Sequence, residues 1–174
     1  MKNLEIKVEV ENLSDIKNHL AFSTYKDTLE QVDTYFLLGE TKIKIREEKM
    51  ANELIIYFRK MKNGSRESRY YRLSLNLLGY FVVKSALSLL LGIKVRVVKT
   101  RDLYIYKNTR IHIDSTNNLG NFVELETVCN DPICDKEYQD EHEEIKKKLA
   151  LNEYKIIAGS YSDLLWEKKL MHSF

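Results

Sequence analysis

Hydrophobic and polar residues alternate along several short segments of this chain, which is the pattern of β-strands. In residues 2–10, Ile6 and Val8 would point to one side of an extended backbone, whereas Glu5 and Lys7 would point to the other. The same one-sided row of charge opposite an aliphatic row recurs in 42–46 and 110–114. The pattern therefore predicts strands that carry charge on one face and apolar side chains on the other.

The whole chain is predicted to contain about eight strands together with helices. The expected strands span residues 2–10, 29–37, 40–47, 52–60, 66–73, 94–106, 109–115 and 121–128. Helices are expected from Ser14 or Asp15 to His19–Ala21, from Asn76 to Leu91, from Asp135 to Leu151, and after Ser160. Lys62-Asn63-Gly64 is a turn sequence suited to a hairpin between the fourth and fifth strands.

Eight such strands predict an α+β fold built on a closed, eight-stranded antiparallel barrel with an ionic interior. Helices packed outside the barrel would cover the aliphatic faces that hold Ile43, Ile45, Ile111 and Ile113. The alternative is an open antiparallel sheet with one solvated face. That alternative explains each strand alone, but it explains poorly why the polar face carries Arg, Lys and Glu instead of Ser and Thr.

Size and composition indicate a globular protein, and we expect residues 1–174 to form a single domain. With 31% charged and 44% hydrophobic residues, the composition favours neither disorder nor a membrane span, and the longest apolar run, 79–92, is too short to cross a bilayer. A cytoplasmic location is expected, because no apolar signal segment follows Met1. The net charge of +2 gives no global basic field for nucleic acid. We expect Cys129 and Cys134 to be reduced thiols without a zinc site.

The basic side chains gather on the strand faces that are predicted to point inward. They are Lys7, Lys42, Lys44, Arg46, Arg59, Lys99, Arg101 and Arg110. Two cations about 6 Å apart repel by roughly 3 kcal/mol at an effective dielectric of about 20. An enclosure with several such pairs favours a ligand with several negative charges, and a polyphosphate chain is the obvious candidate.

Carboxylates share the inward faces with these cations. The acidic candidates are Glu5, Glu9, Asp114, Glu124 and Glu126, with Asp33 and Tyr35 as further lining candidates. Such oxygen ligands suit Mg²⁺ or Mn²⁺, and a metal beside a cationic cradle suits phosphoryl or nucleotidyl transfer. The alternative is that each carboxylate forms a salt bridge with a facing lysine. His112 has the same parity, and we expect a hydrogen-bonded wall residue there.

Several segments in this order resemble the CYTH superfamily, also called triphosphate tunnel metalloenzymes, and within it the class IV adenylyl cyclases. The segments are "NLEIKVEV", "QVDTYF", "TKIKIRE", "LIIYFRK", "VVKTRDLYIY", "RIHID", "LGNFVELETV" and "GSYSDLL". The resemblance runs from residue 3 to about residue 165. In the family motif E-x-E-x-K, the second Glu and the Lys fall on Glu5 and Lys7, whereas Asn3 replaces the first Glu.

The resemblance implies a closed tunnel that binds a triphosphate through basic residues and a divalent metal, Mg²⁺ or Mn²⁺, through glutamates. The implied phosphate-binding residues are Lys42, Lys44, Arg46, Arg59, Lys99, Arg101 and Arg110. The implied metal ligands are Glu5, Glu124 and Glu126, and the catalytic candidates are Lys7 and Asp114.

The superfamily includes enzymes that cyclise ATP and enzymes that hydrolyse inorganic triphosphate or thiamine triphosphate. We expect first a class IV adenylyl cyclase-like enzyme that converts ATP to cyclic AMP and pyrophosphate. The alternatives are a tripolyphosphatase or thiamine triphosphatase and, because of Asn3, a non-catalytic nucleotide- or polyphosphate-binding protein. The expected partner is a small-molecule triphosphate, with a homodimer as a further option and no membrane or nucleic acid.

Overall fold

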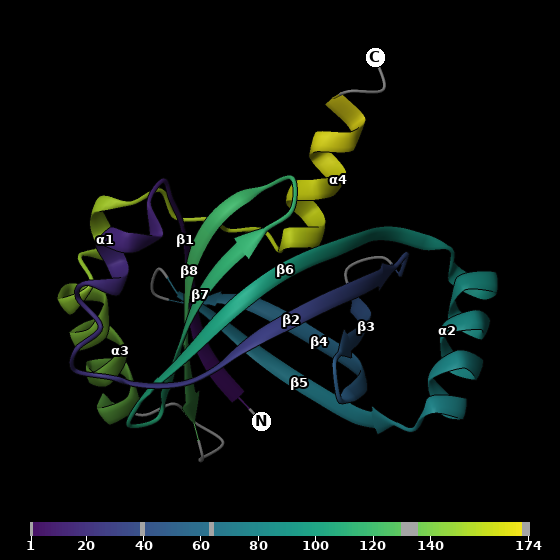
Figure 1. The fold of residues 1–174 in the computed structure, drawn as a ribbon, viewed down its shortest axis with the longest axis horizontal. Helices are drawn as coiled ribbons and strands as arrows, with labels where there is room; N and C mark the ends of the chain where they lie inside the picture. The colour runs from purple at the N-terminus through teal and green to yellow at the C-terminus, as the bar shows by residue number, and fades with distance from the viewer. Residues whose placement is uncertain (1, 39–40, 63–64, 130–135, 172–174) are drawn as a thin grey trace.

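The computed structural model is a closed barrel of eight antiparallel strands with helices outside it (Figure 1). The strands are β1 (Lys2–Val10), β2 (Thr24–Phe36), β3 (Lys42–Glu48), β4 (Ala51–Lys62), β5 (Ser65–Leu75), β6 (Ile93–Tyr106), β7 (Thr109–Thr116) and β8 (Gly120–Cys129). Their order around the barrel is β1-β5-β4-β3-β2-β6-β7-β8, and β1 closes the barrel by pairing with both β5 and β8. The structure describes residues 2–38, 41–62, 65–129 and 136–171, without the side chains of 2, 59–62 and 65–67.

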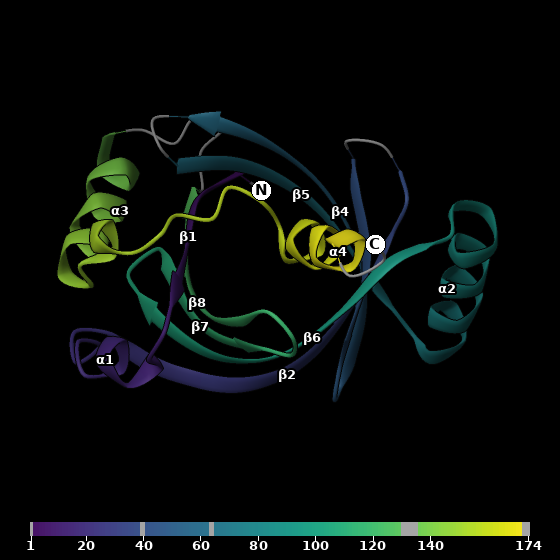
Figure 2. The same cartoon turned by 90° about the horizontal axis from the view of Figure 1, so that it is seen from above.

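In the described residues, four α-helices and one short 3-10 helix accompany the barrel. They are α1 (Leu13–Lys17), α2 (Leu77–Leu91), α3 (Lys136–Lys148), the 3-10 helix η1 (Leu151–Glu153) and α4 (Tyr161–Met171). Seen from above, α1 and α3 lie at one end of the molecule, α2 lies at the other, and α4 stands between them (Figure 2). The predicted caps of α2 are present: the Asn76 side chain accepts a hydrogen bond from the Gly79 N–H, and Gly92 ends the helix with φ 74°.

Helices cover apolar outer faces of several strands, as predicted. Ile111 and Ile113 belong to a buried cluster that includes Ile145 of α3. On the opposite side, Ile43 and Ile45 pack beneath α2 through residues such as Leu87. Since side chains alternate along a strand, the charged residues between these isoleucines must point into the barrel.

The last helix covers one part of the barrel through apolar contacts. Ser160 and Asp163 form the predicted capping box, with the Ser160 N–H donating to the Asp163 carboxylate at 3.1 Å. Tyr161 is buried in a cluster with Tyr35 and Val97, and Trp166 packs against the same cluster.

The observed strands match the prediction closely, and the main differences lie at element ends. Strand β2 begins at Thr24, five residues before the expected start. The hydrophobic pattern did not predict this part of the strand, because its first residues are exposed and do not alternate in hydrophobicity. Helix α3 ends at Lys148 instead of Leu151, since Ala150 has a left-handed backbone with φ 50°. The expected turn at 63–64 and the helix start at Asp135 lie outside the described residues.

Two further expectations from the sequence bear on the outside of the barrel. Cys129 is disulfide-bonded, so the prediction of a reduced thiol is wrong there, whereas Cys134 lies outside the described residues. Within the described ranges, no helix is both long and apolar enough to cross a membrane.

Candidate functional site

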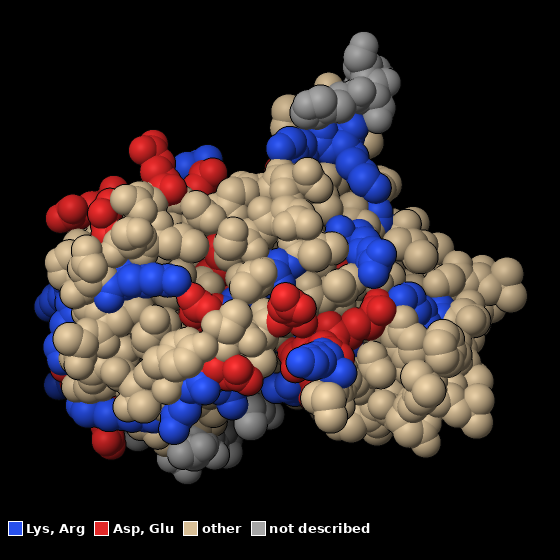
Figure 3. Space-filling model, viewed as in Figure 1, with Lys and Arg blue, Asp and Glu red and all other residues tan. Residues whose placement is uncertain are grey.

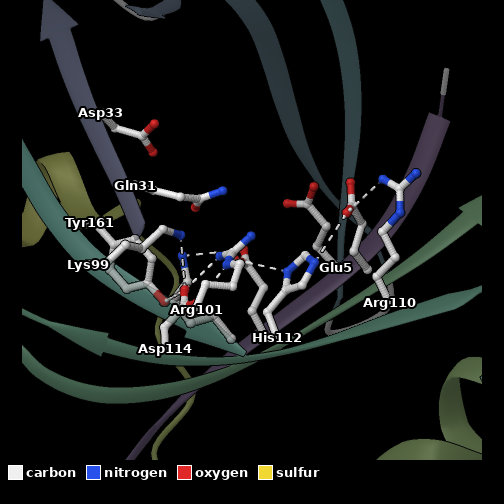
Figure 4. A network of polar contacts seen from close by, with 12 residues as sticks. Glu5, Gln31, Asp33, Lys99, Arg101, Arg110, His112, Asp114 and Tyr161 are labelled. Carbon is white, nitrogen blue, oxygen red and sulfur yellow. Dashed lines mark hydrogen bonds and ion pairs between the residues drawn. The ribbon is translucent and has the colours of Figure 1, made fainter. Parts of the chain in front are cut away.

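The barrel encloses a cavity of about 310 Å³ whose wall is built from inward-pointing side chains of β1 to β8 and the start of α4. Figure 4 shows part of the polar network there, including Glu5, Arg101 and His112. Its charged lining residues are Glu5, Lys7, Asp33, Lys44, Arg46, Glu48, Arg72, Lys99, Arg101, Arg110, Glu124 and Glu126. Among the described lining residues, seven basic side chains accompany five acidic ones. The expected excess of positive charge is therefore largely balanced by carboxylates of the protein itself.

The first cluster is centred on Asp114 of β7, which lies directly opposite Arg101 of β6. The guanidinium of Arg101 donates from Nε and Nη2 to the two oxygens of Asp114, both at 2.6 Å, and Lys99 Nζ donates to Oδ2 at 3.0 Å. Burial disfavours the charged carboxylate, but Arg101 and Lys99 outweigh this and hold the pKa of Asp114 far below its usual value. Asp114 is therefore ionised and orients both cations.

Glu124 and Lys7 extend this cluster. Arg101 Nη2 also donates to Glu124 Oε2 at 2.9 Å, and Lys7 Nζ lies 3.4 Å from Glu124 Oε1. Burial opposes ionisation of Glu124, yet the charges of Lys7 and Arg101, together with the nearby imidazole of His112, lower its pKa well below the usual value. Glu124 is therefore a charged partner of the Asp114 cluster.

Tyr161, the first residue of α4, connects this helix to the Asp114 cluster. Its hydroxyl donates to Asp114 Oδ2 at 2.7 Å, and its ring lies 3.7 Å from Lys7 Nζ and 4.9 Å from Lys99 Nζ. Burial and the repulsion of Arg101 lower the pKa of Lys99 to about 8. Lys99 can consequently change its charge near pH 8.

The second cluster is centred on Asp33 of β2, which lies directly opposite Arg46 of β3. Arg46 donates from Nε and Nη2 at 2.8 and 2.9 Å, and Lys44 Nζ donates to Asp33 Oδ2 at 2.7 Å. Burial raises the pKa of Asp33, but Arg46 and Lys44 outweigh it and bring the pKa well below its usual value. Asp33 therefore binds Lys44 and Arg46 in the same way that Asp114 binds Lys99 and Arg101.

The third group is acidic and lies where β1 meets β8. Glu5 and Glu126 are directly opposite each other in this strand pair. Asn3 and Arg110 donate hydrogen bonds to the two oxygens of Glu126, the second at 3.2 Å, and the Tyr70 hydroxyl donates to Glu5. Burial and the nearby charge of Glu5 raise the pKa of Glu126. This group therefore brings two carboxylates directly opposite each other, whereas each aspartate cluster is centred on one carboxylate bound by an arginine and a lysine.

His112 lies between the acidic group and the Asp114 cluster. Its Nδ1 is 3.9 Å from Glu124 Oε2, and its Nε2 is 3.9 Å from Glu126 Oε2. Burial and the charge of Arg101 lower its pKa to about 3, so the imidazole is neutral. Nδ1 is buried and has no hydrogen-bond partner among the described residues. The residue lies in the wall as expected, but with one ring nitrogen unused.

Four residues from the sequence prediction do not line this cavity or are not described. Asp114 is fully buried, and its partners Lys99 and Arg101 form the lining in its place. Lys42 does not line it; its Nζ donates to Asp163 of α4 at 2.7 Å, and Lys94 binds the same carboxylate at 2.8 Å. Glu9 pairs with Lys155 at 3.1 Å and is also outside the lining. The side chain of Arg59 lies outside the described residues.

The cavity also uses residues that the sequence did not single out. The most important is Tyr161, whose contact with Asp114 depends on α4 folding back over the barrel. Gln31 and Glu48 form a hydrogen bond of 2.6 Å across β2 and β3, and Tyr70 reaches Glu5 from β5. Of these residues, only Tyr161 could have been found from the sequence, because it directly follows the predicted helix cap at Ser160.

The acidic group has the chemistry of a site for a hard divalent cation. Glu5 and Glu126 provide opposed carboxylates, and the buried Oδ1 of Asn3 has no hydrogen-bond partner within the described part of the chain. As they stand, no three His, Cys, Asp or Glu side chains in the described ranges are close enough to hold a metal. Glu124 is turned toward Arg101 and Lys7. The donor set therefore fits Mg²⁺ or Mn²⁺, but Glu124 would have to move to join it.

Comparison with known proteins agrees with this arrangement. The model of the CYTH domain matches residues 1–161. The chain belongs to the CYTH family. Members of this family act on triphosphates, and they generally depend on a divalent metal. No curated protein matches the sequence of this CYTH protein.

Solved structures share the barrel at low sequence identity. A conserved hypothetical protein from Pyrococcus furiosus has a TM-score of 0.79 and 21% identity, over 93% of this chain and 99% of that chain. A candidate adenylate cyclase from Vibrio parahaemolyticus has a TM-score of 0.71 and 15% identity, over 94% and 97%. Another from Bacillus halodurans has a TM-score of 0.58 and 15% identity, over 91% and 95%. These similarities establish the fold of the CYTH protein and leave its substrate to be inferred from the site.

Proposed function

We propose that this CYTH protein is a divalent-metal-dependent enzyme of the class IV adenylyl cyclase type, which converts ATP to cyclic AMP and pyrophosphate. One observation carries the proposal. One cavity is lined by the cations of two ordered clusters, those around Asp33 and Asp114, next to the opposed carboxylates of Glu5 and Glu126. A triphosphate chain with its metal has the complementary distribution of charge.

The cation clusters would bind and orient the phosphate chain. Asp114 and Asp33 bind the Nε and Nη2 groups of Arg101 and Arg46, so the guanidinium groups are held in place and Nη1 of each would donate to phosphate oxygens. Lys44 and Lys99 add two further donors, and Arg110 is placed at the acidic end of the cavity. Because Asp33 and Asp114 hold these groups in place before a ligand arrives, little side-chain freedom is lost on binding.

The acidic group would hold the metal through Glu5, Glu126 and Glu124, with the Asn3 Oδ1 as a neutral donor. A divalent cation bound there supplies charge neutralisation to the phosphate that reacts. In cyclisation the ribose 3′-hydroxyl attacks the α-phosphorus, and pyrophosphate leaves. Lys7, which lies between Glu124 and the Tyr161 ring, is placed to stabilise negative charge on the reacting phosphate.

Hydrolysis of tripolyphosphate is the second candidate. The cavity volume of about 310 Å³ is at the small end for ligand pockets, which usually measure roughly 300–1,000 Å³, and this favours a compact substrate. In that reaction water attacks the terminal phosphorus, and the same cations bind a chain shifted along the tunnel.

Incubation with ATP, tripolyphosphate or thiamine triphosphate, each with Mg²⁺ or Mn²⁺, distinguishes these activities. Cyclic AMP and pyrophosphate in equal amounts are the expected products from ATP, and ion-exchange chromatography separates them from ADP and orthophosphate. Orthophosphate released from tripolyphosphate, with ATP unchanged, would support the second candidate instead. Binding of triphosphates by calorimetry without any product would refute both and favour a binding protein.

A further inference from the structure

Helix α2 exposes a large apolar face to solvent. Every residue of α2 is described, and none of them is buried. Leu78, Val82, Leu89 and Leu90 are 74%, 60%, 86% and 77% exposed. On the face seen in Figure 3, the surface at the α2 end of the molecule is accordingly almost free of Lys, Arg, Asp and Glu. Monomeric proteins rarely leave such a continuous apolar surface uncovered.

The exposed residues follow the spacing of a helix that pairs with another helix. Tyr80, Val83, Leu87 and Leu91 form the opposite face and pack on the barrel. On the outer face, Leu78, Val82, Ser85 and Leu89 succeed one another at intervals of four, three and four residues. This is the a/d spacing of a two-helix seam, and the small side chain of Ser85 lets a partner helix approach closely.

The seam is complementary to itself in the antiparallel direction. When two copies of α2 pack antiparallel, Leu78 of each lies opposite Leu89 of the other, and Val82 lies opposite Ser85. The large side chains then meet at both ends, and a small residue faces a larger one in the middle. A twofold interface requires this kind of match, because the same surface is used by both partners.

The distribution of charge on α2 favours a second copy of this chain over other partners. The only charged residue of α2 is Lys84, and it is turned to the barrel, where it binds Glu47 at 2.8 Å. Two copies can therefore meet without repulsion. A helix that lies on a lipid surface carries basic residues along its polar flank, and α2 has none there.

The available apolar area is large enough for a dimer. Beside α2, Tyr71 and Leu73 of β5 are 66% and 58% exposed, next to strand residues that α2 covers. Together with Leu77, Leu78, Phe81, Val82, Leu89 and Leu90 they present on the order of 500 Å² of apolar side chain. A standard interface buries about 800 Å² on each partner, so these side chains would form most of its centre.

We propose that the outer face of α2, with Tyr71 and Leu73, is the interface of a twofold homodimer in which two α2 helices pack antiparallel. This inference does not depend on the substrate of the tunnel. It extends the expectation of a homodimer by naming the surface and the register.

Analytical ultracentrifugation of the full chain at about 1–100 µM tests the proposal. The wild type is expected to sediment with twice the mass of one chain, and Leu89→Glu is expected to weaken the dimer about 100-fold or more. Leu78→Lys should do the same from the other end of the seam. Because both leucines are mostly exposed, circular dichroism should show unchanged folding. Met171→Glu, which changes an equally exposed apolar residue on α4, is the matched control and should remain dimeric.

A charge exchange tests the register. The double variant Leu78→Lys/Leu89→Glu places the introduced lysine of each copy opposite the introduced glutamate of the other. Its dimer should therefore return and weaken at high salt, whereas Leu78→Glu/Leu89→Glu should stay monomeric. A wild-type monomer at about 100 µM, or a Leu89→Glu variant that dimerises like the wild type, would overturn the proposal. A monomer that instead binds phosphatidylcholine vesicles would assign the surface to lipid and overturn it as well.

Discussion

The Asp33 and Asp114 clusters and the Glu5–Glu126 group lie in the same cavity, yet their electrostatics are opposite. Each aspartate is bonded by an arginine and a lysine, and its pKa is lowered despite burial. In the acidic group two carboxylates oppose each other across a strand pair, and the pKa of Glu126 is raised. In the proposed function, the aspartates would therefore order the cations that bind the phosphate chain, whereas the glutamates would hold the metal.

The largest effect is expected from breaking an aspartate cluster. Asp114→Asn leaves Lys99 and Arg101 buried beside an uncharged amide, so the free energy of unfolding should fall by about 3–5 kcal/mol. Urea denaturation measures this loss. Asp102→Asn on the same strand pair removes a half-exposed ion pair with Lys17 and should cost less than about 1 kcal/mol. Equal losses in the two variants would contradict the structural role of Asp114.

In the acidic group, a substitution can lower activity without lowering stability. The folded protein raises the pKa of Glu126, so its ionised form lowers stability at neutral pH, and Glu126→Gln should leave the free energy of unfolding unchanged or slightly higher. The pKa of Glu124 is lowered, and Glu124→Gln should reduce stability by about 1–3 kcal/mol. Both variants should lose about 100-fold or more in metal-dependent turnover. Full activity in both would remove these residues from the metal site.

Asn3 offers a way to strengthen the acidic group. Asn3→Glu adds a third carboxylate beside Glu126, replacing a side chain that now donates a hydrogen bond to it. We expect about tenfold tighter Mn²⁺ binding and a less stable metal-free protein, because like charges are brought together. Calorimetric titration with Mn²⁺ and thermal melts with and without metal measure the two effects. Asn3→Gln is the control, and an identical response of both variants would argue against metal at this position.

The smallest effect concerns the pH dependence of ligand binding. The pKa of Lys99 is about 8 in the free protein, and a bound triphosphate should raise it. Above pH 8 binding must therefore take up a proton at Lys99, and the affinity for tripolyphosphate should fall about fivefold between pH 8 and 9. Calorimetry in two buffers with different ionisation enthalpies measures the proton uptake. Lys99→Arg should bind without it; proton uptake that persists in this variant would point to another group.

The sequence was sufficient to predict the barrel and most of its lining. Strand alternation has a period of two, so it decides which face a side chain occupies, and Lys7, Lys44, Arg101 and Glu124 all point inward as predicted. The alternation does not show where along the barrel axis a residue lies. Lys42 has the correct face, but it lies where Asp163 of α4 reaches it.

Contacts between distant segments account for what the sequence could not show. The balance of charge depends on Asp33 and Arg46, whose pairing follows from the register of β2 with β3. Tyr161 reaches Asp114 across 47 residues of sequence. Neither contact has a local pattern, because both depend on how the barrel closes and on where α4 packs.

The position of α4 has a practical consequence for experiments. Trp166 is the single tryptophan of the chain, and it packs against the cluster around Tyr161, which lines the cavity and whose hydroxyl binds the buried Asp114. Its fluorescence therefore comes from one known place, on the same helix as a residue that touches the cation clusters. Occupation of the tunnel that displaces Tyr161 should change this emission, so the protein contains its own optical reporter of ligand entry.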